Sequence, residues 1–186
     1  MLDEAKRYAL RHHADHVRPN AAREPVASHL AEVSRHVADE GAPEHVVAAA
    51  WLHDVVEDTV VTLHDLRAEF GDRVADIVDG LTDPEGFAAM PLAERKRRQA
   101  ERVARLPDDV KLVKLADQVS NMKSVVEDPP VDWDAGDCLA YLSGAAAVAA
   151  ACGGVSSRLE ELAAHHGARG HARYGVQGRA KDELGH

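Results

Sequence analysis

Apolar residues recur along most of this chain at intervals of three and four, which is the spacing of one face of an α-helix. In the segment 108–127, for example, Leu112, Leu115, Val119 and Met122 form such a stripe. No segment alternates for long at the two-residue period of a strand. The pattern predicts helices over residues 2–17, 28–40, 43–56, 62–70, 72–81, 91–105, 108–127, 137–152 and 155–166. We therefore expect an all-α fold, a compact single-domain helical bundle.

Several residues support these boundaries because they favour the first turn of a helix. Thr62 and Asp65 have the spacing of a capping box, and Ser28 is a suitable N-cap. Pro43 and Pro91 suit the starts of the helices that follow them.

The length of 186 residues suits one well-buried domain. Hydrophobic residues make up 45% of the sequence, and aromatic residues only 4%. This composition indicates a core built mainly from Ala, Val and Leu, which suits packed helices. We assign residues 1–166 to this domain. The remainder, 167–186, is rich in Gly, Arg and His and has little apolar content, so it is expected to be a flexible tail.

Composition also bears on location and redox chemistry. The apolar stretches are far shorter than a membrane span, and the start of the chain does not resemble a signal peptide, so we expect a cytoplasmic protein with no membrane partner. Two cysteines, Cys138 and Cys152, are too few for a disulfide framework and are expected to be small buried residues.

The net charge of −10 argues against nucleic acid as a partner. One segment departs from this balance, since residues 90–114 carry eight basic side chains against four acidic ones. Most of these charges are explained by a solvated helix face. One or two of them could instead reach toward an anionic substrate.

Candidate chemistry is concentrated in the segment from Leu52 to Thr59, which follows an apolar run. It holds an imidazole and three carboxylates, those of His53, Asp54, Glu57 and Asp58. Such groups are costly to bury without a partner, and a divalent metal ion is a suitable one. A second His-Asp pair, at 64–65, lies in the first turn of a polar helix and is interpreted as a solvated capping pair.

A metal site needs further ligands. His29 follows an irregular loop that contains two prolines, and Asp117 lies within the apolar stripe of 108–127. A buried mid-helix Asp needs a partner, which could be a salt bridge to Lys114 or Arg105, or a metal ion. The metal hypothesis combines two imidazoles and two carboxylates, those of His29, His53, Asp54 and Asp117. That donor set suits Mn, Fe or Mg-like ions and leaves positions for water and substrate.

The order of these residues resembles that of the HD-domain metal-dependent phosphohydrolases. The resemblance is more specific to the hydrolase domain of the Rel/Spo family and to small alarmone hydrolases, and it extends from about Arg18 to Ala149. It is carried by the blocks at residues 49–59, 70–71, 78–83, 94–96 and 111–122.

The resemblance implies one Mn2+ ion, with Mg2+, Fe2+ or Co2+ as alternatives, held by His29, His53, Asp54 and Asp117. It implies that Glu57 and Asp58 are the catalytic pair that positions and activates water. The implied reaction removes the 3′-pyrophosphate from guanosine bis-diphosphate alarmones (ppGpp and pppGpp), giving GDP or GTP and pyrophosphate. The expected partner is therefore a small-molecule nucleotide.

The resemblance also implies substrate contacts by Arg18, Lys96, Asn121 and Tyr141, although Tyr141 could equally be a core residue. The chain departs from the family pattern at four positions, Pro19, Val26, Leu30 and Asp137. An aromatic surface and phosphate contacts are expected there in the family. Hydrolysis of another nucleotide or phosphate ester is therefore the alternative function. A non-catalytic nucleotide-binding module fits less well, because a binder has no need of the pair Glu57 and Asp58.

Overall fold

The structure of the chain is a computed structural model that describes residues 1–183, with side chains through Gly175. Within that range the extended regular elements are all helical, and the bridges Val17–Pro25 and Asn20–Pro130 are isolated. This confirms the all-α prediction. The elements are α1 (Leu2–His12), α2 (Val26–Asp39), α3 (Glu44–Leu52), α4 (Val55–Asp58), α5 (Leu63–Phe70), α6 (Asp72–Leu81), the 3-10 turn η1 (Phe87–Ala89), α7 (Leu92–Val103), α8 (Asp108–Glu127), α9 (Ala135–Ala151) and α10 (Ser157–Glu183).

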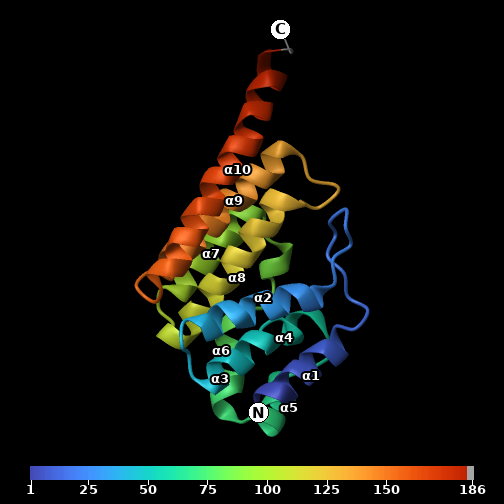
Figure 1. Cartoon of the computed structure of the whole chain (residues 1–186), viewed down its shortest axis with the longest axis vertical. Coiled ribbons are helices and arrows are strands. Elements are labelled where there is room, and N and C mark those ends of the chain that lie inside the picture. Colours follow the sequence, from blue (N-terminus) through green and yellow to red (C-terminus); the bar gives the residue numbers. More distant parts are fainter. Residues whose placement is uncertain (184–186) are drawn as a thin grey trace.

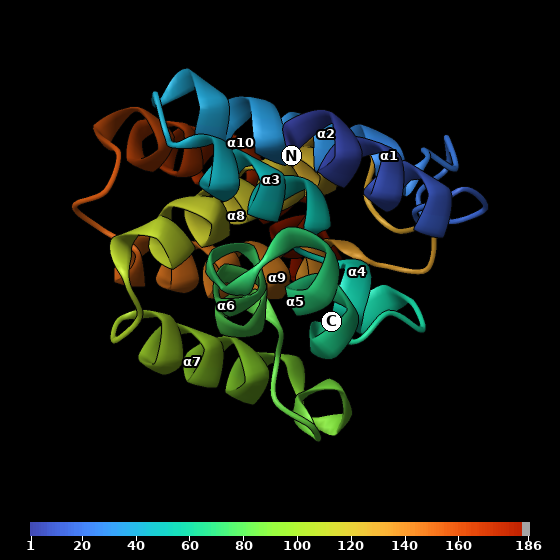
Figure 2. The same ribbon diagram turned by 90° about the horizontal axis from the view of Figure 1, so that it is seen from below.

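Helix α8 is the centre of the molecule. Figure 1 shows α7 to α10 running along the long axis, while α1 to α6 gather at one end. Helix α8 packs against α2, α3 and α6 of the group at that end and against α7, α9 and α10 of the group along the long axis. Its buried residues therefore do not fall on one narrow stripe, and Figure 2 shows α8 in the middle of the molecule with other helices around it. A polar residue on this helix is consequently placed in the interior.

The core has the composition expected from the sequence, since small and aliphatic residues dominate it. Cys138 and Cys152 are buried free thiols, as predicted. Among the described helices, none combines the length and the apolar character needed to cross a membrane.

Helix starts follow the predicted chemistry at some places and not at others. The capping box at Thr62 is confirmed: its hydroxyl accepts from the Asp65 N–H at 3.2 Å, and the Asp65 carboxylate accepts from the Thr62 N–H at 2.9 Å. The prediction of Ser28 as an N-cap is wrong, because α2 already begins at Val26 after Pro25. The fixed φ of proline suits a helix start and replaces a side-chain cap there.

The prediction of a helix through residue 17 is wrong, because α1 ends at His12 and the segment 13–25 forms a folded loop. The Arg18 N–H donates to the Glu24 carbonyl at 2.8 Å, which turns the loop back on itself. The Val131 N–H donates to the Pro19 carbonyl at 3.0 Å, and the Ala22 N–H donates to the Asp128 carboxylate at 3.0 Å. These bonds fix the loop against the connection between α8 and α9.

The predicted tail requires a correction. Helix α10 continues through the expected boundary at residue 166, and Tyr174 is only 5% exposed. The Tyr174 hydroxyl donates to the Val125 carbonyl at 2.6 Å, and Gly170 packs against Leu142 and Val126. A flexible tail is therefore wrong for residues 167–175. The segment has few large apolar residues because its glycines and alanines allow close helix packing. The last predicted tail residues, 184–186, lie outside the described residues.

The close approach at Gly170 predicts opposite effects of two glycine substitutions on one helix. A Cβ atom at position 170 would overlap the buried side chain of Leu142, whereas nothing lies within 4 Å of one at Gly175. We expect Gly170→Ala to destabilise the fold by about 1–3 kcal/mol in chemical denaturation. Gly175→Ala should be neutral or stabilise it by up to about 1 kcal/mol, because alanine favours a helix. Equal effects of the two substitutions would contradict the packing of this segment.

Candidate metal and phosphate site

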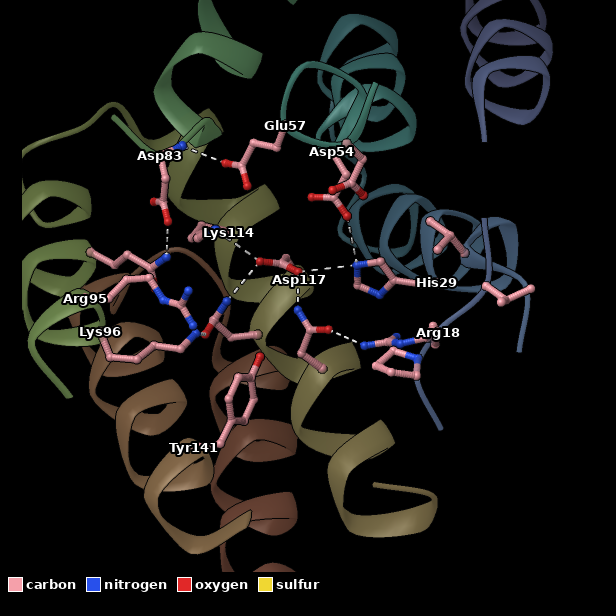
Figure 3. A pocket seen from close by; sticks show the side chains of 17 residues that line it. Arg18, His29, Asp54, Glu57, Asp83, Arg95, Lys96, Lys114, Asp117 and Tyr141 are labelled. Atoms are coloured by element: carbon pink, nitrogen blue, oxygen red, sulfur yellow. Dashed lines mark hydrogen bonds and ion pairs between the residues drawn. The ribbon is translucent and has the colours of Figure 1, made fainter. Parts of the chain in front are cut away.

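Four side chains from three parts of the chain converge beside α8. His29 lies in the first turns of α2, His53 and Asp54 lie between α3 and α4, and Asp117 lies in the middle of α8. The sequence pattern predicted one helix over 43–56, but the helix stops at Leu52 and restarts at Val55. This break turns the Asp54 carboxylate toward His29, as Figure 3 shows.

The converging atoms have the spacing of ligands around one ion. The two Nε2 atoms of His29 and His53 are 3.2 Å apart, and Asp54 Oδ2 lies 3.6 Å and 3.2 Å from them. Asp117 Oδ1 lies 3.4 Å from His29 Nε2 and 3.8 Å from His53 Nε2. Ligand atoms held at about 2.1 Å from a common centre are separated by about 3.0–3.5 Å.

Hydrogen bonds on the far side of each imidazole turn both Nε2 lone pairs inward. His53 Nδ1 donates to the Ala50 carbonyl at 2.7 Å. His29 Nδ1 lies 2.9 Å from Ser120 Oγ, whose own proton is donated to Glu32 Oε2 at 2.8 Å. In the neutral imidazoles the remaining nitrogens are therefore acceptors. Two such nitrogens and two carboxylates pointing at one place repel each other unless a cation lies between them, so these residues fit a divalent metal ion.

The charges around the cluster also favour a cation. Burial opposes the ionisation of Asp117, but Lys114 at 3.2 Å and the two histidines outweigh it and hold the pKa of Asp117 well below its ordinary value. Burial likewise disfavours a charged His53, yet the carboxylates of Asp54 and Asp117 raise the pKa of His53 to about 9. The negative charges of the two carboxylates therefore outweigh the cost of burying a positive charge between them.

Two further carboxylates lie next to this cluster on the short helix α4. Burial raises the pKa of Glu57, and burial together with the charge of Asp54 raises the pKa of Asp58. Glu57 Oε1 accepts from the Asp83 N–H at 2.6 Å, which fixes one of its oxygens. Both carboxylates line the same cavity, and a raised pKa makes each a better proton acceptor.

A cavity of about 340 Å³ opens over the cluster. Its wall includes all four residues that the sequence suggested as substrate contacts, Arg18, Lys96, Asn121 and Tyr141. It also includes Arg95 and Lys114, so cationic and acidic groups face one space. In Figure 3, Arg95 and Lys96 lie on one side of Asp117 and Arg18 lies on the other.

Lys96 is buried in an unusual way for a lysine. Its stem packs on Gly144 of α9, where a Cβ would lie only 2.7 Å from Lys96 Cγ. Its ammonium donates to Gln118 Oε1 at 3.1 Å and lies 4.7 Å from the centre of the Tyr141 ring. Burial, with the nearby charge of Lys114, lowers the pKa of Lys96 to about 8.

The loop 13–25 contributes Arg18 to the opposite wall. The Arg18 guanidinium donates to Asn121 Oδ1 at 2.5 Å, and Asn121 Nδ2 donates to Asp117 Oδ1 at 2.5 Å. The amide thus connects Arg18 to Asp117 through two hydrogen bonds.

The departures from the family pattern have different structural meanings. Val26 and Pro19 line the cavity, so they affect a ligand directly. Leu30 is fully buried in the core. Asp137 is exposed, and its carboxylate accepts from the Asp134 N–H at 3.0 Å in a capping box that starts α9. The charge at Asp137 therefore belongs to a helix start.

Some functional candidates were missed or left undecided by the sequence. The sequence left open whether Asp117 forms a salt bridge or binds a metal ion. The structure has the salt bridge, to Lys114, and Asp117 also belongs to the candidate ligand cluster. The basic segment divides in two, since Arg97 and Arg98 form surface ion pairs with glutamates while Arg95 and Lys96 line the cavity. The bond from Ser120 to Glu32 had no signal in the sequence, because the two residues lie 88 positions apart.

Comparison with known proteins agrees with this geometry. The HD domain family matches residues 5–135. The chain is 34% identical to the guanosine-3′,5′-bis(diphosphate) 3′-pyrophosphohydrolase MESH1 of Danio rerio, over 87% of this chain and 89% of that protein. It is also 34% identical to MESH1 of Homo sapiens, over 88% of this chain and 91% of the relative.

A solved structure of a metazoan orthologue of SpoT, described as hydrolysing ppGpp, superposes with a TM-score of 0.82 at 30% identity. The match covers 89% of this chain and 92% of the other. The chain therefore belongs to the HD-domain family, in the Rel/Spo hydrolase-like branch that contains MESH1.

Proposed function

We propose that this chain is a metal-dependent hydrolase that removes the 3′-pyrophosphate from ppGpp or pppGpp, giving GDP or GTP and pyrophosphate. The observation that carries the proposal is the convergence of two imidazole lone pairs and two carboxylates at the base of a cavity lined by cations. The likeness to MESH1 over most of both chains supports the substrate.

In this proposal His29, His53, Asp54 and Asp117 hold the metal ion, which is Mn2+ by the family resemblance. A bound divalent ion supplies positive charge that lowers the pKa of water and stabilises charge on phosphate oxygens. The donor set, with as many carboxylates as imidazoles, suits Mn2+ and equally admits Mg2+, Fe2+ or Co2+.

The chain's own residues then orient and deprotonate water. Asp58 has the raised pKa of a proton acceptor and lies at the cavity wall. Glu57, held by the Asp83 N–H, keeps its second oxygen available as a hydrogen-bond acceptor for the same water. Arg18, Arg95 and Lys96 offer donors to phosphate oxygens, and Tyr141 offers a ring and a hydroxyl to the nucleoside.

A second candidate, hydrolysis of another nucleotide or phosphate ester, is favoured by one observation. Val26 lies in the cavity wall, where an aromatic stacking surface is expected in the family. A side-by-side assay of ppGpp, pppGpp and nucleoside monophosphates with metal-loaded protein separates the two functions. A preference for the guanosine bis-diphosphates supports the first, and a preference for monophosphates contradicts it.

The acidic pair gives a direct test of the chemistry. We expect Asp58→Asn to lower kcat for pyrophosphate release from ppGpp by about 100-fold to 10,000-fold, because the amide cannot accept a proton. Metal content of the purified variant should stay at the wild-type level. The control is Asp79→Asn, an exposed acid on α6, which should keep full activity. Full activity of Asp58→Asn would remove Asp58 from the reaction.

The hydrogen-bond chain behind His29 predicts an effect on metal affinity. Ser120→Ala and Glu32→Gln each break the chain that fixes the orientation and tautomer of His29. We expect each to weaken Mn2+ binding by about 10-fold to 100-fold in calorimetric titration of the metal alone. Ser124→Ala, one turn further along α8, is the matched control and should bind Mn2+ as the wild type does. Unchanged affinity in the Ser120 variant would refute the orienting role.

The buried ammonium predicts an alkaline limb in the pH profile. Lys96 is protonated below its pKa of about 8 and loses its charge as the pH rises past that value. Because kcat/KM reports the free enzyme, it should fall above about pH 8 as the phosphate contact is lost. In Lys96→Arg the guanidinium stays charged, so the limb should move to higher pH. The same limb in both proteins would assign it to another group.

A further inference from the structure

A second convergence of ligand atoms lies on the other side of Asp58, where the loop after α1 passes α4. His13 is 1% exposed, and its Nδ1 lies 3.0 Å from the Ala9 carbonyl. A carbonyl only accepts, so Nδ1 carries the proton and Nε2 of the neutral ring carries a lone pair. Within the described residues this buried Nε2 has no hydrogen-bond partner. A buried polar atom without a partner is costly, and His13 Nε2 is one of three such side-chain atoms in the described part of the chain.

The unpartnered nitrogen points at another acceptor. His13 Nε2 lies 3.9 Å from Asp58 Oδ2, and the ring of His16 lies edge-on to His13 with centroids 5.3 Å apart. One ligand atom from each of the three residues lies within 4.8 Å of the others. The backbone holds this arrangement, since the His16 carbonyl accepts from the Val26 N–H at 3.0 Å. Three residues that can each donate a lone pair to a metal ion therefore lie around one small space.

We propose that His13, His16 and Asp58 form a second metal site, which binds a borderline divalent ion of the zinc or cobalt class. Two imidazoles and one carboxylate are the donor set of several open zinc sites, in which water fills the remaining positions. The set holds fewer carboxylates than the cluster around Asp117, so it selects Zn2+ or Co2+ over Mn2+. The Asp58 side chain is 45% exposed, so this second site binds more weakly than the buried cluster.

The consequence of occupancy rests on the proposed function. Asp58 belongs to both arrangements: it is the proposed proton acceptor for water and the only carboxylate among the three second-site residues. An ion bound to its oxygens withdraws the lone pairs that would accept the proton. The second site is therefore inhibitory, and it makes the hydrolase sensitive to excess Zn2+ while Mn2+ occupies the first cluster.

The binding experiment uses the full chain, stripped of metal and titrated with Zn2+ alone by calorimetry. The wild type should bind Zn2+ in two steps, and in His16→Gln the weaker step should lose affinity by about 100-fold. The exposed His64→Gln is the matched control and should retain both steps. Equal stoichiometry and affinity for wild type and His16→Gln would overturn the proposal.

His13→Gln replaces a buried residue and could unfold the chain, so a second measurement addresses His13 in the wild type. The 15N resonance of His13 Nε2 should shift when Zn2+ fills the weaker site. It should stay unchanged when the first cluster alone is filled with Mg2+, a diamagnetic substitute for Mn2+. An unshifted His13 Nε2 at full Zn2+ occupancy would also overturn the site.

An activity arm keeps this proposal separable from the proposed function. Added Zn2+ should inhibit Mn2+-loaded wild type on ppGpp, and His16→Gln should need about tenfold more Zn2+ for the same inhibition. Equal inhibition of the two proteins contradicts the inhibitory role. If ppGpp is not hydrolysed at all, the proposed function fails, and the Zn2+ titration still decides whether the second site exists.

Discussion

The structure depends on the burial of one carboxylate, that of Asp117, in the middle of the central helix. A lone charge in that position would cost far more than the helix could recover through packing. The pKa of Asp117 stays well below its ordinary value because Lys114 places a positive charge beside it and Asn121 donates a hydrogen bond to it. Lys114 and Asn121 lie on neighbouring turns of α8 itself, while the histidines that share the site come from α2 and the α3–α4 break. The chemistry of the site and the packing of the fold therefore meet at the same residue.

The site is built at places where regular structure stops. His29 follows a loop that is fixed to the α8–α9 connection, and His53 and Asp54 occupy the two positions between α3 and α4. A continuous helix would carry Asp54 around the axis, away from His53. The break lets adjacent residues present an imidazole and a carboxylate to one point. Rigid neighbours then hold that point, because the apolar run before His53 is buried throughout.

The sequence predicted most of what local chemistry determines. Periodicity predicted nearly every helix, and the unusual acids at Asp54 and Asp117 indicated the residues that the structure brings together. It could not predict the stop at Leu52, because the residues 46–56 favour a helix without interruption. Nor could it predict that Ser120 orients His29, since a serine on a helix has no local mark of its partner. The tail was misjudged at Tyr174 and Gly170 because contact between helices gives small residues a packing role that composition does not reveal.

The bond between Arg18 and Asn121 has a consequence for which molecules can enter the cavity. One nitrogen of the Arg18 guanidinium already donates to a neutral amide oxygen, that of Asn121. A ligand replaces that contact favourably only if it offers a stronger acceptor than the amide, and a charged phosphate oxygen does so while a neutral hydroxyl does not. The resting contact thus acts as a threshold for charge. At this contact, selectivity arises from the exchange of one acceptor for another, and a ligand without negative charge gains little from that exchange.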